Sequence, residues 1–361
     1  MKISKIPGLG RFGSFVDGVD FDYVTDEEWL EIGKLHLNSL VTIIRNTNLT
    51  KTRYIEQIGK WGTPRDTASY YFTKKHHITP IEALNSNANV GEEDGKWLQF
   101  LRPLLETDEQ GQPLALLKVT GKKNEYGEPV GLFAEGELLW HSNESGNLLF
   151  TPGVSLLGET GMVGSSTGFM TTVDWYEKQS ESFRSELDEM VVLHRFAPGK
   201  INPGLRKEQD MIIYKNMCPV DDSRVPMVMR SPGGHKGLHF SVHTMYSIEG
   251  MSKKDSDSVF ERIAKELFVP EYTYDHWYQN DNDLCLFDNS ITLHRRLGGV
   301  ENRLAQRIQY DYNHIQQDNY NPYIQKEFQD VYKKQMRDYF ITMGRSNELS
   351  FKDRVLSKLG F

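Results

Sequence analysis

Two histidines in distant parts of the chain stand in contexts that suit metal binding. His141 ends the run Leu138-Leu139-Trp140-His141 and is followed two residues later by Asn143, whereas His294 lies far downstream. In a β-strand, residues i and i+2 point to the same face, so a His-x-Asn pair can present both side chains to one ion. His294 would reach that ion from elsewhere in the fold. Together, His141 and His294 look like two of the three protein ligands of a metal site.

Iron is the metal that this pattern suggests. Two histidines and one carboxylate on one face of Fe(II) form the facial triad of non-haem oxygenases, and the opposite positions stay open. One pair of open positions holds the two oxygens of a 2-oxo acid, and another position holds O₂. Here the usual carboxylate position is Asn143. The pattern thus indicates a reaction class and departs from it at one side chain.

Further short motifs follow in a fixed order, although each is weak alone. They are Trp140-His141-Ser142-Asn143-Glu144, Ser166-Thr167, Ser182-Phe183-Arg184 to His194-Arg195-Phe196, Asp288-Asn289 before His294, and the pair Arg303 and Arg307. In this order and spacing the chain resembles the taurine dioxygenase-like family of Fe(II)/2-oxoglutarate oxygenases. The resemblance begins with Gly18-Val19-Asp20-Phe21 and runs to about Tyr312.

The resemblance implies a role for each matching residue. His141 and His294 would bind Fe(II). Arg307 would form a bidentate pair with the distal carboxylate of 2-oxoglutarate, a task that suits a planar guanidinium and not lysine. Thr167 would donate a hydrogen bond to the same carboxylate, and Arg303 would assist or face the substrate. Asp288-Asn289 would close a turn with its side chains.

The implied activity is that of a dioxygenase acting on a small polar metabolite. O₂ would convert 2-oxoglutarate to succinate and CO₂, and a C–H bond of the substrate would be hydroxylated or desaturated. The metal supplies this chemistry, while the protein supplies positioning and exclusion of water.

Asn143 leaves several interpretations open. It could bind iron through its neutral carbonyl oxygen, or Glu144 could replace it if a bulge turned that side chain inward. The position could stay open, as in related halogenases where chloride fills the gap. Asparagine is bulkier than the residue used there, which ranks halogenation below hydroxylation. Finally, a weakened site would leave a non-catalytic protein that binds a small molecule or a partner.

Three more histidines occur at positions 235, 239 and 243. Their spacing would suit a second metal on a helix, but Gly233, Gly234 and Gly237 favour a loop that enters a strand. In a strand His239 and His243 would share a face, so they could line a pocket.

The elements that must position these residues can be recognised from periodicity and capping signals. Thr25 and Glu28 form a capping box before a helix. The other expected helices follow Thr50 to near Gly59, cover Val173 to Met190 as one amphipathic segment, include 259–268, and lie in the tail after Asn321. The expected strands are 41–44, 138–141, 283–288 and 304–312, with hairpins between 105 and 139.

The element order predicts the fold class. No regular βαβ alternation is present, which favours a mixed α/β protein with an antiparallel core. We expect a double-stranded β-helix (a cupin-like jelly roll) flanked by helices. One domain would span 1–320 with a lid-like insertion at 196–235, and a helical extension would cover 321–361.

Composition restricts the protein class. The 361 residues are 25% charged and 38% hydrophobic with a net charge of −8, as in soluble globular proteins. The acidic balance argues against nucleic-acid binding, and no apolar run suits a membrane helix or a signal peptide. Cys218 and Cys285 match no CxxC spacing. We expect a cytoplasmic protein with a small-molecule substrate and O₂ as partners, and the aromatic tail could pack in a homo-oligomer.

Overall fold

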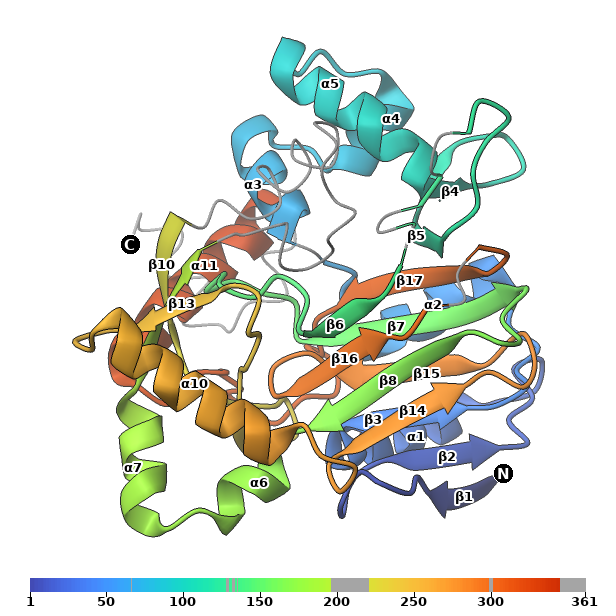
Figure 1. Cartoon of the computed structure of the whole chain (residues 1–361). Coiled ribbons are helices and arrows are strands. Elements are labelled where there is room, and N and C mark those ends of the chain that lie inside the picture. Colours follow the sequence, from blue (N-terminus) through green and yellow to red (C-terminus); the bar gives the residue numbers. More distant parts are fainter. Residues whose placement is uncertain are drawn as a thin grey trace.

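Two facing β-sheets form the centre of the computed structural model, which describes residues 1–65, 67–127, 130–131, 134, 136–195, 221–298 and 301–344. The larger sheet has eight strands, in the spatial order β1 (Lys2–Lys5), β2 (Ser14–Asp17), β3 (Val41–Ile44), β15 (Leu284–Asp288), β7 (Gly153–Thr160), β17 (Leu304–Tyr310), β5 (Pro113–Thr120) and β4 (Leu105–Thr107). The smaller sheet has the order β14 (Thr273–Trp277), β8 (Ser166–Thr171), β16 (Thr292–Arg296) and β6 (Leu138–His141). Figure 1 shows the two sheets packed one over the other.

Strand pairing follows the predicted antiparallel pattern. Within the described strands, β2 and β3 pair in parallel and the other pairs are antiparallel. Apolar residues of both sheets fill the space between them, including Val154 and Leu156 of β7, Phe169 of β8, Phe287 of β15 and Ala305 of β17. This core forms the floor of the site described below.

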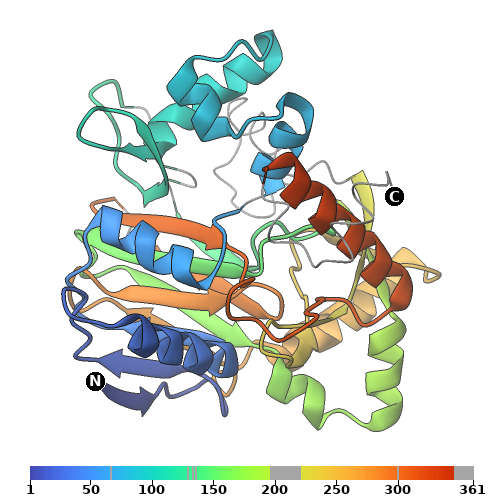
Figure 2. The same ribbon diagram turned by 180° about the vertical axis from the view of Figure 1, so that it is seen from behind.

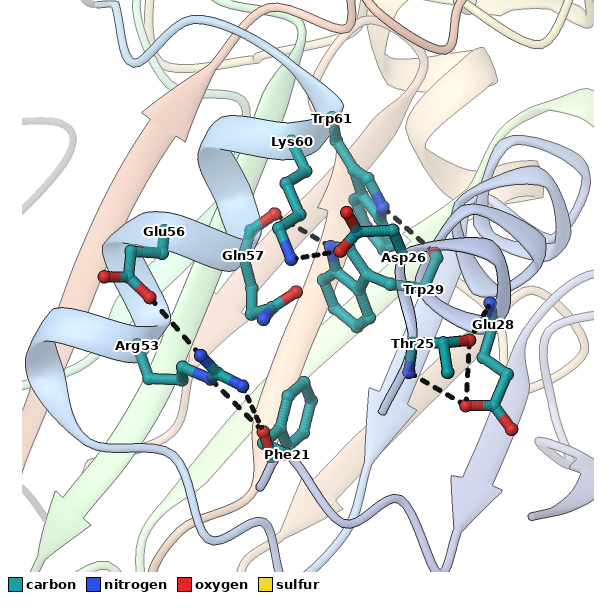
Figure 3. A network of polar contacts seen from close by, with 10 residues as sticks. All are labelled: Phe21, Thr25, Asp26, Glu28, Trp29, Arg53, Glu56, Gln57, Lys60 and Trp61. Carbon is teal, nitrogen blue, oxygen red and sulfur yellow. Dashed lines mark hydrogen bonds and ion pairs between the residues drawn. The ribbon is translucent and has the colours of Figure 1, made fainter. Parts of the chain in front are cut away.

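Helices cover the outer face of the large sheet, as Figure 2 shows for α1 (Asp26–Ser39) and α2 (Lys51–Trp61). The predicted capping box starts α1, because Thr25 Oγ1 accepts from the Glu28 amide and Glu28 accepts from the Thr25 amide. The rings of Trp29 and Trp61 stack with centroids 4.2 Å apart. The Trp29 indole donates to Gln57 O and the Trp61 indole to Trp29 O, so both buried N–H groups are satisfied (Figure 3).

The remaining elements lie beyond the two large sheets. The helices are α3 (Thr67–His76), α4 (Pro80–Ser86), α5 (Glu92–Leu101), the 3₁₀ turn Arg102–Leu104, α6 (Val173–Lys178), α7 (Glu181–Glu189), α10 (Lys253–Leu267) and α11 (Lys326–Thr342). A separate three-stranded sheet contains β10 (Asp221–Pro226), β9 (Val191–Arg195) and β13 (Met245–Ile248). A hairpin contains β11 (Val228–Arg230) and β12 (Lys236–Leu238). No helix among the described residues is long and apolar enough to span a membrane.

Two expectations at the element level were wrong. The single helix from Val173 to Met190 is two helices, because Ser180 caps α7 by accepting a hydrogen bond from the Phe183 amide. The strand expected through His239 and His243 ends at Leu238, so the two histidines are not alternate residues of one strand.

Parts of three further expectations lie outside the described residues. These parts are 196–220 of the expected lid, Cys218 within it, and 345–361 of the C-terminal extension. The other cysteine, Cys285, is a buried free thiol.

Candidate active site

The four-stranded sheet of β14, β8, β16 and β6 brings the two predicted histidine ligands together. His141, the last residue of β6, is the direct antiparallel partner of His294 in β16. Their ring centroids lie 4.1 Å apart. Two imidazoles from segments far apart in the sequence therefore lie side by side on β16 and the edge strand β6 of the four-stranded sheet.

Both imidazoles are held in the neutral form. Burial lowers the pKa of His141 to about 4 and the pKa of His294 well below its ordinary value, and the nearby charge of Arg307 acts in the same direction on both. His141 Nδ1 donates to Leu139 O at 2.7 Å, so Nε2 of that ring carries the free lone pair. Neutral imidazole with an available lone pair is the form that ligates a metal.

Asn143 is fixed by the turn that precedes β16. Its backbone N–H donates to Asn289 Oδ1 at 2.8 Å. Asn289 Nδ2 donates to the backbone carbonyl of Asn143 at 3.0 Å and to that of Thr151 at 2.9 Å. The segment after His141 is thus tied to the segment before His294 by reciprocal hydrogen bonds.

The same turn contains a buried acid. Asp288 Oδ1 accepts from the amides of Ser290 and Ile291, which confirms the predicted side-chain closure of the turn. Its Oδ2 is buried with no hydrogen-bond partner among the described residues. Burial raises the pKa of Asp288 to about 7, well above the value of a free aspartate.

This acid gives a testable pH dependence of stability. Between about pH 4 and pH 7 Asp288 is ionised in the unfolded chain and protonated in the folded protein, so its contribution to the unfolding free energy falls as pH rises through that window. Each pKa unit is worth about 1.4 kcal/mol. Asp288→Asn keeps the Oδ1 acceptor and removes the ionisation, so the variant should gain about 2 to 3 kcal/mol on wild type between about pH 5 and pH 7.5. Urea unfolding at both pH values measures this gain, and an equal difference at both would contradict it.

A cavity of about 60 Å³ lies against the two histidines. Its lining residues are Val119, Leu138, His141, Asn143, Val154, Leu156, Thr167, Phe287, His294, Arg295, Arg296, Arg303 and Arg307. Most of them belong to strands of the two facing sheets. The cavity is apolar on its floor and carries three metal-ligand candidates and several cations around it.

Arg303 lies in the part of the cavity next to Thr167. It is 2% exposed, and its Nη1 donates to Ser166 O at 3.2 Å while Nε is buried without a partner. Among the described residues Arg303 forms no ion pair with a carboxylate. Thr167 Oγ1 lies 3.0 Å from Tyr278 OH. A buried cation without a counter-charge is unfavourable unless an anion binds there.

Arg307 lies nearer to the histidines. Alternation along β17 puts Ala305, Arg307 and Gln309 on the inner face, which Arg303, the residue before β17, shares. Ile308 and Tyr310 pack under α1 and α2. The charge of Arg307 acts on both His141 and His294. The sequence expectation paired Arg307 with Thr167. Both residues line the cavity, and Arg303 donates to the carbonyl of Ser166, the residue before Thr167.

Glu144 does not line the cavity. Its backbone is left-handed (φ 59°), and its carboxylate accepts from the Thr151 amide at 2.7 Å and from Gln309 Nε2 at 2.8 Å. The structure brings His141, Asn143, His294, Thr167, Arg303 and Arg307 around one cavity and leaves Glu144 behind Asn143.

The other histidines do not form a second metal site within the described part of the chain. His239 is buried, donates through Nδ1 to Ser290 O at 2.9 Å, and packs on Phe150. His235 packs on Phe12. No group of three His, Cys, Asp or Glu side chains among the described residues could hold a metal, because the third member of the cavity cluster is an amide.

Comparison with known proteins decides the family. The sequence profile of the taurine catabolism dioxygenase TauD, TfdA family matches residues 3–309. The chain belongs to this family. Enzymes of the TauD/TfdA family use Fe(II) and 2-oxoglutarate, so the family confirms the expected cofactors. No curated protein sequence matches the chain.

Solved structures share the fold of this TauD/TfdA member. AAD-2 in complex with Mn(II) and N-oxalylglycine superimposes with a TM-score of 0.60 and 18% identity, covering 86% of this chain and 97% of AAD-2. A taurine dioxygenase from Burkholderia xenovorans gives a TM-score of 0.57 and 18% identity, with 85% and 89% covered. At this identity the likeness concerns the fold.

The donor set of the cavity fits an iron centre with an unusual third ligand. Two neutral imidazoles and one amide oxygen can bind a divalent first-row metal, and the cation of Arg303 fits the carboxylate of a 2-oxo acid. Sequence reasoning missed Asn289, Tyr278 and Gln309, which contact the predicted residues. The sequence marks Asn289 only as a turn residue, and no local signal marks the other two.

Proposed function

We propose that this chain is an Fe(II)- and 2-oxoglutarate-dependent dioxygenase that hydroxylates or desaturates a C–H bond of a small polar metabolite. One observation carries the proposal: two neutral histidines and a buried arginine without a carboxylate partner among the described residues share a cavity. Family membership supports the same reaction class. The two facing sheets support the expected double-stranded β-helix. We retain, as part of the proposal, one domain over 1–320 and a C-terminal extension over 321–361.

We assign the metal ligands to His141, Asn143 and His294. His141 would bind through Nε2, since its Nδ1 is engaged by Leu139 O. Asn143 would bind through Oδ1. Iron bound there supplies O₂ activation coupled to oxidative decarboxylation of 2-oxoglutarate.

We assign the distal carboxylate of 2-oxoglutarate to Arg303 and Thr167. Arg303 Nε has no partner among the described residues, and a guanidinium edge matches a carboxylate in a bidentate manner. Thr167 adds a hydroxyl held by Tyr278. Arg307, nearer the histidines, would then face the metal end of the cavity and the substrate. The apolar floor from Val154, Leu156 and Phe287 would keep water away from the reacting groups.

The amide at position 143 bears on the alternative activities. Asn143 occupies cavity space, so the ligand position is not reduced to a small residue that leaves room for chloride. This ranks hydroxylation above halogenation. A non-catalytic binding protein is the alternative of another class, because an amide donates less charge to iron than a carboxylate does.

Spectroscopy and product analysis together test the proposal. Anaerobic addition of Fe(II) and 2-oxoglutarate should give a weak visible charge-transfer band, and admission of O₂ should yield succinate. Chlorinated product and a chloride-dependent spectrum would favour the halogenase. Absence of the band together with absence of succinate across a substrate screen would refute the oxygenase proposal.

A further inference from the structure

A chain of hydrogen bonds links Asn143 to its sequence neighbour Glu144 through Gln309. Glu144 Oε2 accepts from the Thr151 amide at 2.7 Å, and Oε1 accepts from Gln309 Nε2 at 2.8 Å. Gln309 Oε1 in turn accepts from Asn143 Nδ2 at 3.2 Å. Four groups are therefore connected in one line from a backbone amide to the cavity.

The carboxylate at one end sets the direction of every bond in this line. An ionised carboxylate only accepts, so Gln309 must turn its NH₂ group to Glu144 and its carbonyl oxygen to Asn143. Asn143 must then offer Nδ2 to Gln309. Its Oδ1 accepts no hydrogen bond from any described residue, while the side chain lines the cavity with His141 and His294. The Asn143 side-chain amide, which could otherwise exchange its oxygen and nitrogen by a flip, is thus fixed with Nδ2 toward Gln309 and Oδ1 left for the cavity.

The backbone of Glu144 is a second, independent observation. Its φ of 59° lies in the left-handed region, which is unfavourable for a residue other than glycine and costs of order 1 kcal/mol or more. This conformation accompanies the turn of its carboxylate back toward Thr151 and Gln309. A glutamate in this unfavourable backbone conformation indicates that the hydrogen bonds of its side chain are functionally important.

We propose that Glu144 and Gln309 are positioning residues that hold Asn143 Oδ1 toward the metal, so that residues 143 and 144 are a matched pair. The inference rests on the proposed function, since it concerns the metal of that site. Glu144 acts without touching the metal. Asn143 can serve as the third ligand because the Glu144 carboxylate, acting through Gln309, determines that Oδ1 and not Nδ2 of Asn143 points to the metal.

The pairing predicts what each substitution does. With Glu144→Gln, the Thr151 amide still requires an oxygen, so the introduced amide side chain turns its NH₂ to Gln309. Gln309 and Asn143 then reverse, and Asn143 presents an N–H donor to the metal. With Asn143→Asp, two acceptors flank Gln309, and its single NH₂ can satisfy only one of them. The double variant restores a consistent line, with a carboxylate facing the metal.

Mn(II) binding measured by calorimetry on the full-length, metal-free protein tests the first change. Glu144→Gln should weaken Mn(II) binding at least ~10-fold, in the range found for outer-shell partners of metal ligands. The matched control is Glu159→Gln. Glu159 accepts a hydrogen bond from Gln306 Nε2 at 2.6 Å. Gln306, like Gln309, belongs to β17, but its side chain lies on the outer face of that strand. That variant should bind Mn(II) as wild type does.

The double variant supplies a sign test that a merely structural role would not pass. Glu144→Gln should weaken Mn(II) binding in wild type but strengthen it in the Asn143→Asp background, to at least the wild-type level. The thermal midpoint of the metal-free proteins should fall with Asn143→Asp and recover when Glu144→Gln is added. Glu159→Gln should not produce that recovery.

The outcomes separate the two proposals. If Glu144→Gln acts with the same sign in both backgrounds, or has no effect in either, the matched pair is refuted while the metal site stands. If wild type binds no Mn(II), the proposed function is refuted. The thermal midpoints still decide whether the three side chains are coupled, because that measurement needs no metal.

Discussion

His294→Ala should strongly weaken metal binding at the cavity and, with it, lower succinate formation. His294 supplies one of two imidazoles that line the cavity, and its ring is neutral because burial lowers its pKa well below the ordinary value. Removing one of the three proposed ligands, the others being an imidazole and a neutral amide, should weaken Mn(II) affinity more than ~100-fold, beyond the effect of losing an outer-shell partner. Calorimetric titration with Mn(II) measures the loss.

His235→Ala is the matched control for this prediction. His235 is a partly buried histidine that packs on Phe12 and does not line the cavity. Its removal should leave Mn(II) affinity unchanged. Circular dichroism verifies that both variants fold, and His141→Ala provides a second ligand variant. Full Mn(II) affinity in folded His294→Ala and His141→Ala would contradict the metal site.

Arg303→Leu should weaken binding of N-oxalylglycine, an analogue of 2-oxoglutarate, by ~100-fold or more. Truncating one partner of a buried charged pair costs about 2 to 5 kcal/mol. Arg303→Lys should not restore binding, because an ammonium cannot match the carboxylate in a bidentate manner. Calorimetry with N-oxalylglycine on the Mn(II)-loaded protein gives the affinities.

Arg307→Leu is the comparison that makes this prediction specific. Arg307 lies on the same face of β17 but nearer the histidines, so its loss should change N-oxalylglycine affinity less than loss of Arg303 does. Arg303→Leu should also leave the unfolding free energy equal or higher, since it removes a buried cation that has no carboxylate partner among the described residues. A larger effect of Arg307→Leu would return the distal carboxylate to Arg307.

Local signals in the sequence were sufficient for much of the framework. The capping box at Thr25 and Glu28 marks the start of α1, and the run ending at His141 is β6 with the predicted bounds. A similar signal is present at Thr79, which forms a second capping box with Glu82 at the start of α4, with Pro80 as the first helical residue. Ser180 likewise marks the break between α6 and α7. Both are readable because caps depend on residues three or four apart.

The detailed arrangement of the site could not be derived from local signals. Asn143 contacts Asn289 and Gln309, and Thr167 contacts Tyr278, across large sequence separations. Such contacts depend on strand order and register, which alternation alone does not determine. The same limit applies to the two arginines, whose roles in the proposed site differ from those expected from the sequence. Arg303 and Arg307 share one strand face, and only the register of β17 decides which one lies beside Thr167.

A crystal structure of the protein with Mn(II) and N-oxalylglycine would test the central claim most directly. We expect Mn(II) bound by His141 Nε2, His294 and Asn143 Oδ1, with the distal carboxylate of N-oxalylglycine on Arg303 and Thr167. Glu144 should remain on Thr151 and Gln309. Metal bound by Glu144, or metal and N-oxalylglycine absent from this cavity at saturating concentrations, would contradict it.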